Sequence, residues 1–175
     1  MEGQAQHFEP LDQTPHDITY LRSTRLSNPK VKVTYGRPTT DATEVFGNLV
    51  AYDEVWHTGA NEATEVKFYE PVLFGDVLIS AGTYSLFTIP SEHNWQVILN
   101  TQTDVLGAHF YDPDYNIAQI SVRPKKGEYL ASFSIAFKST EDYQYHMILA
   151  WERQRIQIPL HFQKKSEPIP YTSVE

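Results

Sequence analysis

Side chains suited to chemistry are concentrated in one nine-residue stretch, W-H-T-G-A-N-E-A-T, at residues 56–64. Here an imidazole (His57), an amide (Asn61) and a carboxylate (Glu62) stand between an aromatic anchor and a predicted strand. The central Gly-Ala pair lets other groups approach the backbone closely, and the amide offers a neutral donor and acceptor beside the carboxylate. The stretch is therefore our candidate site. The alternative is a tight turn in which Asn and Thr side chains satisfy backbone groups.

Two kinds of chemistry are open to this stretch. A His57 and Glu62 pair can act as general base and orienter, because imidazole titrates near neutral pH and a carboxylate can hold its tautomer. With His109, Tyr111 and Asp112 the stretch also offers oxygen and imidazole ligands for a metal. However, no pair stands at a recognised spacing such as H-x-x-x-H. We therefore predict no metal site and no cofactor.

The remaining nucleophiles and histidines give weaker signals. No G-x-S-x-G motif is present, which argues against a serine nucleophile. His146 alternates with apolar neighbours, and His161 lies on the polar side of the last predicted strand. Both are interpreted as ordinary structural or surface histidines.

Arg37 precedes a proline at a predicted strand end and is the expected partner of Glu62. Removing one member of a buried ion pair costs about 3 to 5 kcal/mol. On this expectation Glu62→Gln and Arg37→Met each destabilise the fold strongly, and the double variant is less than additive.

Aromatic residues are the other clue, with 11 Tyr, 9 Phe and 3 Trp in the chain. Alternation places Trp95, Phe133 and Phe162 on apolar faces, so we predict that they belong to the core. Four aromatic residues stand beside predicted turns, namely Tyr52, Trp56, Tyr111 and Tyr115. They are either simple loop anchors or the wall of a pocket. Such a pocket would suit a neutral polar ligand, such as a sugar, or a hydrophobic small molecule. The candidate ligand-binding residues are Arg37, Trp56, His57, Asn61, Glu62, Tyr84 and Tyr111.

Composition limits the classes of function. A chain of 175 residues that is 41% hydrophobic can fill the core of one domain. A net charge of -8 with 14 scattered Lys and Arg residues argues against a nucleic-acid partner. There is no cysteine, which removes disulfides and thiolate chemistry, and there is no apolar run of about 18 residues that would span a bilayer.

Hydrophobic residues recur with a period of two, which is typical of half-buried strands. The pattern predicts an all-β domain of about nine or ten strands, an antiparallel β-sandwich (jelly-roll-like) or a flattened barrel, with little helix. Residues 143–151 and 153–162 form the clearest predicted hairpin. Only residues 41–47 and 103–111 have a pattern that allows a helical turn. The other predicted strands lie near residues 30–35, 64–69, 77–79, 82–89, 94–100, 118–123 and 128–138.

Proline positions predict the domain limits. Residues 1–29 read as a partly ordered N-terminal arm with at most a short strand near 18–21, residues 30–163 as one β domain, and residues 164–175 as a tail.

Several segments, in order, carry a family resemblance: Arg37-Pro38, V-F-G-N-L-V at 45–50, Tyr52, W-H-T-G-A-N-E-A-T, A-G-T-Y-S-L-F-T-I-P at 81–90, Trp95, Asn100 and Trp151-Glu152. With them, residues 30–162 resemble the bacterial domain of unknown function 2911 family (DUF2911). The resemblance implies an all-β domain without an established activity, usually exported in Bacteroidetes-type bacteria behind a signal peptide. It therefore implies a periplasmic or secreted location, although residues 1–6 lack the basic and apolar regions of a signal peptide. If Met1 is an added start codon on the mature form, the G-Q-A-Q at residues 3–6 is what remains of a signal peptide.

This chain departs from the family pattern at three positions. Thr43, His57 and Gln119 stand where the resemblance leads us to expect arginine. Arginine binds anions through its fixed guanidinium fork. The loss of these arginines argues against an anion-binding role for this member.

Two classes of function remain. We prefer a non-catalytic module of the cell envelope that binds a small, neutral polar or sugar-like molecule or has a structural role. The alternative is a small-molecule enzyme built on His57 and Glu62, with or without a metal. Convergence of His57, Glu62, Arg37 and Tyr84 on one cavity would favour the enzyme. The sequence names neither a ligand nor an oligomeric state.

Overall fold

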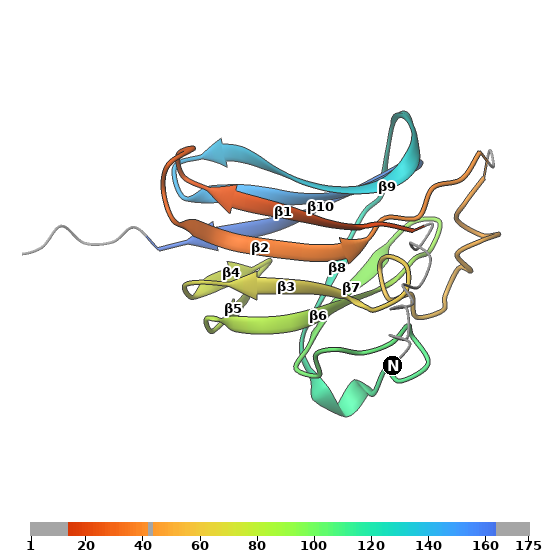
Figure 1. Ribbon diagram of the computed structural model, residues 1–175, viewed down its shortest axis with the longest axis horizontal. Helices are drawn as coiled ribbons and strands as arrows, with labels where there is room; N and C mark the ends of the chain where they lie inside the picture. Colours follow the sequence, from red (N-terminus) through yellow and green to blue (C-terminus); the bar gives the residue numbers. More distant parts are fainter. Residues whose placement is uncertain (1–13, 42–43, 164–175) are drawn as a thin grey trace, which may run out of the picture.

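The computed structural model describes residues 14–41 and 44–163. Two antiparallel sheets form a sandwich-like fold and do not close into a barrel (Figure 1). The predicted all-β sandwich is therefore confirmed over the flattened barrel. Within the described residues, no helix has the length and hydrophobicity needed to cross a membrane.

The larger sheet has six strands in the order β1-β2-β3-β6-β7-β8. Their bounds are His16–Arg22 (β1), Pro29–Gly36 (β2), Thr64–Phe68 (β3), Gly82–Ile89 (β6), Trp95–Asn100 (β7) and Asn116–Val122 (β8). The second sheet has the order β5-β4-β10-β9. Its strands are Val77–Ile79 (β5), Val72–Phe74 (β4), Gln144–Phe162 (β10) and Lys125–Glu141 (β9).

Alternation along the strands places the core between the sheets. Val31, Val33 and Tyr35 of β2 are buried, while the intervening residues are partly exposed. Trp95 begins β7 with 3% of its surface exposed and lies 4.6 Å from the ring of Phe46, centroid to centroid. The prediction that Trp95 belongs to the core is confirmed, and Trp95→Ala should cost about 3 to 5 kcal/mol.

Strand β10 turns back on itself. A fully extended strand of 19 residues spans about 60 Å, yet the amide of Phe162 donates to the carbonyl of Tyr143, with N and O 2.8 Å apart. The reversal lies at Glu152, whose φ is +50° and where the pairing with β9 shifts register. In Figure 1 both ends of β10 accordingly lie at the same end of the sandwich. The predicted hairpin is confirmed in this form.

Three details differ from the sequence prediction. Strand β4 was not predicted, because three residues are too short for a periodic signal. A 3-10 helix stands at Pro113–Tyr115, capped by Asp112, whereas residues 103–111 contain a hydrogen-bonded turn at 107–110 and no helix. Of residues 41–47, positions 42 and 43 lie outside the described residues and the others are not helical.

The expected short strand near residues 18–21 is present as β1, which pairs with β2. The division into arm, domain and tail stays a prediction. Residues 1–13 and 164–175 lie outside the described residues.

Candidate functional site

The candidate stretch runs across the end of β2 before it enters β3. A Cβ atom added at Gly36 would lie 2.0 Å from the backbone oxygen of Ala60, and one added at Gly59 would lie 3.0 Å from the oxygen of Gly36. Two backbones can come this close only where side chains are absent. The predicted close approach at the Gly-Ala pair is confirmed, with Gly36 as its partner.

Thr58 has an unusual backbone conformation at the centre of the stretch. Its φ is +58°, a left-handed value that is a genuine outlier for a β-branched residue. The side chain is fully buried, and its hydroxyl lies 3.1 Å from the hydroxyl of Thr88 on β6. The hydroxyl of Thr64 donates to the carbonyl of Thr58 at 2.7 Å. For these threonines the turn interpretation is therefore correct, and their hydrogen bonds hold a strained backbone in place.

Trp56 anchors the stretch in the core. Its ring packs almost parallel to that of Trp151, at an interplanar angle of 24°, and edge-to-face against Phe133. The indole Nε1 donates to the carbonyl of Gly59 at 3.1 Å. Because this hydrogen bond joins residues three apart, it closes residues 56–59 into a turn around the indole ring.

A cavity of about 530 Å³ opens beside this turn. It is lined by Pro38, Thr39, Thr40, Leu49, Val50, Trp56, His57, Gly59, Ala60, Asn61 and Trp151. Three of the seven predicted ligand-binding residues thus meet here: Trp56, His57 and Asn61. We call this space the Trp56 cavity.

The Trp56 cavity contains no Asp, Glu, Lys or Arg among its lining residues. Burial lowers the pKa of His57, because desolvation penalises the imidazolium form. His57 is accordingly neutral at pH 7, and one ring nitrogen can donate while the other accepts. The cavity therefore offers neutral hydrogen-bonding groups beside two indole rings.

Glu62 does not belong to the cavity. Its carboxylate lies 2.9 Å from Nε2 of His16 on β1, and 54% of its side chain is exposed. The next residue, Ala63, is buried, so Glu62 faces the opposite side of the chain and points to solvent. The expected Glu62–Arg37 ion pair is wrong.

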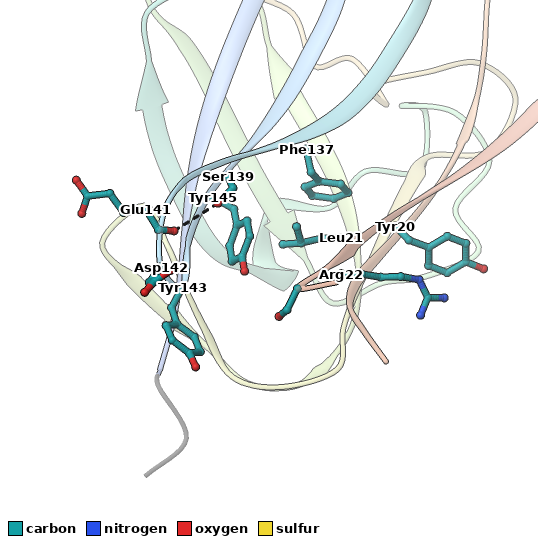
Figure 2. A pocket seen from close by; sticks show the side chains of 10 residues that line it. Tyr20, Leu21, Arg22, Phe137, Ser139, Glu141, Asp142, Tyr143 and Tyr145 are labelled. Carbon is teal, nitrogen blue, oxygen red and sulfur yellow. Dashed lines mark hydrogen bonds between the residues drawn. The ribbon is translucent and has the colours of Figure 1, made fainter. Parts of the chain in front are cut away.

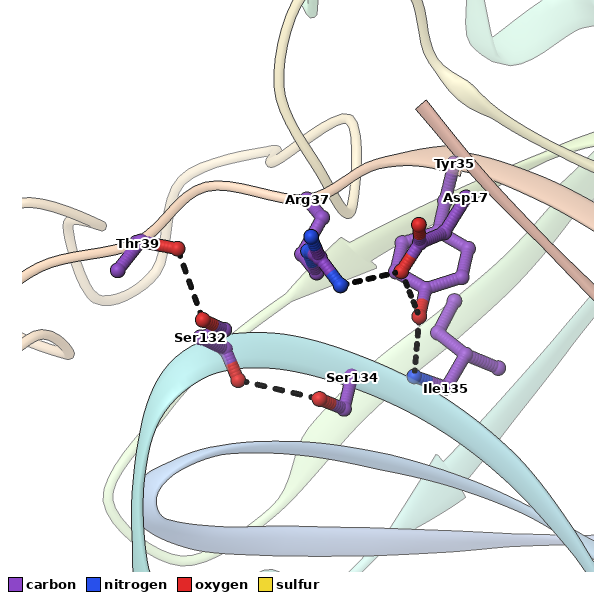
Figure 3. Close-up of polar contacts among 7 residues, drawn as sticks. All are labelled: Asp17, Tyr35, Arg37, Thr39, Ser132, Ser134 and Ile135. Carbon is purple, nitrogen blue, oxygen red and sulfur yellow. Dashed lines mark hydrogen bonds and ion pairs between the residues drawn. The ribbon is translucent and has the colours of Figure 1, made fainter. Parts of the chain in front are cut away.

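Arg37 instead pairs with Asp17 of β1, with Nη1 and Oδ2 3.1 Å apart (Figure 3). The hydroxyl of Tyr35 lies 3.5 Å from the same carboxylate and accepts from the amide of Ile135 on β9 at 3.2 Å. Burial is the largest cause of a raised pKa at Tyr35, so this phenol stays protonated at neutral pH. We call these four residues the Tyr35 cluster.

The Tyr35 cluster joins β1 and β2 to β9, an edge strand of the other sheet. Its physical role is to hold the two sheets together along one edge. Sequence reasoning missed it, because Ile135 is 100 residues from Tyr35 and no local pattern indicates which strand edges meet.

Tyr84 and Tyr111 lie elsewhere. The hydroxyl of Tyr84 donates to the carbonyl of Ser80 at 3.1 Å, and its ring faces Phe68. Tyr111 accepts a 2.7 Å hydrogen bond from Asn116 and packs against Phe87. Neither lines the Trp56 cavity.

The predicted aromatic wall reduces to Trp56. Tyr52 packs against the core, and Tyr115 lies in the 3-10 turn with 48% exposure. Of the three positions where arginine was expected, His57 lines the cavity, Gln119 is exposed on β8, and Thr43 lies outside the described residues. Within residues 14–41 and 44–163 no three metal-ligating side chains are grouped for an ion.

A second cavity of about 530 Å³ lies between the end of β1 and the β9–β10 turn (Figure 2). Leu21, Phe137 and Tyr145 form its inner wall, and Glu141 and Asp142 lie on its rim. None of the predicted site residues lines it. It marks the place where the edges of the two sheets separate beyond the Tyr35 cluster.

Comparison with known proteins gives one match. The sequence profile of a family described as protein of unknown function (DUF2911) matches residues 19–160. Comparison with curated proteins and with solved structures finds no match. Because the matched region covers most of the 175 residues and nearly all of the sandwich, the chain belongs to the DUF2911 family.

Proposed function

We propose that this protein binds a neutral polar small molecule of the sugar type in the Trp56 cavity. The main observation in support is that the cavity lining contains no Asp, Glu, Lys or Arg, although these residues make up 21% of the sequence. A charged ligand would lose hydration there without gaining a partner of opposite charge. A neutral ligand does not meet this cost.

The lining suits such a ligand in size and chemistry. Its volume of about 530 Å³ lies within the range of small-molecule sites. Pro38 and Leu49 offer apolar surface for the C–H face of a sugar ring, and Trp56 and Trp151, which are 7% and 4% exposed, add the small part of their rings that reaches the cavity. His57, Asn61 and the hydroxyls of Thr39 and Thr40 supply donors and acceptors around them.

Asn61 is the best residue for a test. Its φ is +64°, a conformation that glycine adopts without strain, so Asn61→Gly removes the amide without adding backbone strain. Asp53→Gly is the matched control, since Asp53 also has a left-handed φ of +59° and lies outside the cavity lining.

Glucose and N-acetylglucosamine are the neutral probes, and glucosamine and gluconate are their charged counterparts. Calorimetry, together with the fluorescence of the two cavity tryptophans, should show that the neutral sugars bind and the charged ones do not. Asn61→Gly should weaken the affinity about tenfold, which corresponds to one lost hydrogen bond. Asp53→Gly should leave the affinity unchanged. Equal affinity for charged and neutral probes, or no binding at all, would contradict the proposal.

The enzyme alternative lacks geometric support. His57 lines the Trp56 cavity, whereas Glu62 is paired with His16, Arg37 with Asp17, and Tyr84 lies against Phe68. These four side chains, whose convergence would have favoured an enzyme, therefore do not share one cavity. A structural role in the cell envelope is the outcome if no ligand binds. The envelope location, which follows from the family resemblance, is part of the proposal and is checked by cell fractionation.

A further inference from the structure

A separate cavity of about 650 Å³ lies at the β8 edge of the six-stranded sheet. Its lining comes from the β4–β5 turn, β8, the β8–β9 connection, the first residue of β9 and β10. The lining residues are Gly75, Asp76, Gln119, Ile120, Ser121, Val122, Arg123, Lys125, His146, Gln157 and Pro159. Gly75, with a φ of +62°, packs against Ile120, where an added Cβ would lie 3.0 Å from the side chain. This close contact brings the β4–β5 turn against β8 and forms one side of the cavity, which we call the β8 cavity.

Positive charge gathers at this cavity in a chain whose net charge is -8. The positively charged Arg123 and Lys125 line it together with the titratable His146, against one acidic lining residue, Asp76. Lys138 stands directly opposite His146 in the β9–β10 pairing. These basic side chains lie on three segments that meet at the cavity, namely the β8–β9 connection, β9 and β10.

Protonation of His146 would be electrostatically unfavourable here without a counter-charge. It would place a like charge directly opposite Lys138 on the neighbouring strand, which destabilises a sheet. The pKa of His146 is lowered first by burial and then by Lys125, His161 and Lys138, so nearby positive charge opposes its protonation. An anion bound among these groups would relieve the repulsion.

We propose that the β8 cavity binds the phosphate group of a small phosphorylated molecule. The guanidinium of Arg123 can hold two phosphate oxygens, while Lys125 adds a second charge and the imidazole of His146 adds a donor. Ser121, Gln119 and Gln157 supply neutral polar groups, and the volume leaves room for an organic body attached to the phosphate. Of the three positions where arginine was expected, Gln119 lines this cavity, so Arg123 and Lys125 supply the positive charge that an arginine at position 119 would have added.

Two neighbouring lysines provide a matched test. Lys125 lines the β8 cavity and Lys126 does not, although both are exposed on β9. Lys125→Gln and Lys126→Gln therefore remove the same charge from almost the same place. We would measure binding of inorganic phosphate and of glucose 6-phosphate by calorimetry, with the ionic strength held constant by sodium chloride.

Lys125→Gln, and more strongly Arg123→Gln, should weaken binding of both probes at least tenfold, whereas Lys126→Gln should change it less than twofold. Tighter binding of glucose 6-phosphate than of inorganic phosphate would support recognition of the organic body, and equal binding would support recognition of the phosphate alone. The absence of saturable binding would overturn the proposal. So would equal losses in the two lysine variants, because only general electrostatics would then be at work.

A second measurement reports on the cavity itself. In proton NMR, saturating phosphate should raise the pKa of His146, because an anion favours the imidazolium form. The charged groups that act on His146 are Lys125, Lys138 and His161, and Arg123 and Asp76 share its cavity. An unchanged His146 titration would place any bound phosphate elsewhere and overturn the assignment. Asn61→Gly should leave phosphate binding unaffected, which keeps this test independent of the Trp56 cavity.

Discussion

Thr58 shows how single side chains maintain the candidate site. Left-handed backbone at a β-branched residue costs about 1 to 3 kcal/mol and persists only where the surroundings enforce it. Here the enforcing groups are hydroxyls: Thr58 contacts Thr88, and Thr64 donates to the Thr58 carbonyl. Of the polar residues in the stretch, the threonines support the turn, and His57 and Asn61 face the cavity.

Thr58→Val should lower the free energy of unfolding by about 1 to 3 kcal/mol, because the buried hydroxyl of Thr88 loses this hydrogen-bond partner. Thr88→Val should have a similar effect, and the double variant should cost clearly less than the sum. Urea denaturation of the four proteins gives the coupling. Thr103→Val is the control, since Thr103 is exposed and should change stability by no more than about 0.5 kcal/mol. Fully additive effects would mean that the two hydroxyls do not depend on each other.

Glu62 now has a different expectation from the one that its sequence context suggested. Its side chain is 54% exposed, and its ion-pair partner in the described part of the chain is His16. Exposed ion pairs contribute about 0 to 1 kcal/mol, so Glu62→Gln should change the free energy of unfolding by less than about 1 kcal/mol. A loss of about 3 kcal/mol in urea denaturation would show that the carboxylate has a structural role that its surface position does not explain.

At the scale of elements, the end of β2 and the candidate stretch depend on each other through Gly36. A methyl group at this position would lie 2.0 Å from the backbone oxygen of Ala60, which cannot move without displacing the turn. Gly36→Ala should therefore destabilise the fold by about 1 to 3 kcal/mol through overpacking, and it should also reduce ligand binding in the Trp56 cavity.

Gly127→Ala on β9 is the matched control. Its added Cβ would also be close to a neighbour, at 3.1 Å, but that neighbour is the flexible side chain of Arg155. Thermal and urea denaturation should show little change for Gly127→Ala. An equal loss in the two variants would mean that the backbone contact at Gly36 is not special.

The elements themselves were largely predictable, because each strand carries its own period of two. The buried face of β2 and the hairpin within β10 follow from that period alone. Strand β4 could not be found this way, since three residues hold less than two periods. The helical turn at Pro113–Tyr115 was missed because its signal is one capping side chain, Asp112, and not a periodic pattern.

At the scale of the whole molecule, sequence reasoning failed where distant edges meet. The pattern of each strand is local, whereas the contact of Tyr35 with Ile135 depends on which edges of the two sheets lie together. The same limit explains the partner of Arg37, which is Asp17 of β1, a strand that was expected to be part of a loosely ordered arm. The close approach at Gly59 was predictable, because glycine permits a close backbone contact whichever residue lies opposite.

Acid should destabilise the whole molecule through two partly buried histidines, His57 and His146. Burial lowers the pKa of His57, and burial with nearby cations lowers that of His146. The pKa of a histidine in the unfolded chain is 6.5, so below this pH the unfolded chain binds more protons than the folded one. The contribution of the neutral histidines to stability is therefore present above pH 6.5 and is lost as the pH falls towards their lower pKa in the folded protein. In urea denaturation between pH 7.5 and pH 5.5, His57→Gln combined with His146→Gln should show a shallower loss than the unmodified chain. Identical slopes would contradict this account.

The hydrogen bonds of Thr58 also determine when the candidate site can form during folding. Its partner Thr88 is 30 residues away on β6, and β6 takes its place only when paired with β3 and β7. Until then the local hydrogen bonds from Thr64 and from the Trp56 indole hold the turn without the contact to Thr88, so the strain at Thr58 is only partly offset. Substitutions here should therefore accelerate unfolding and leave the refolding rate nearly unchanged. The sandwich would be complete before its cavity is.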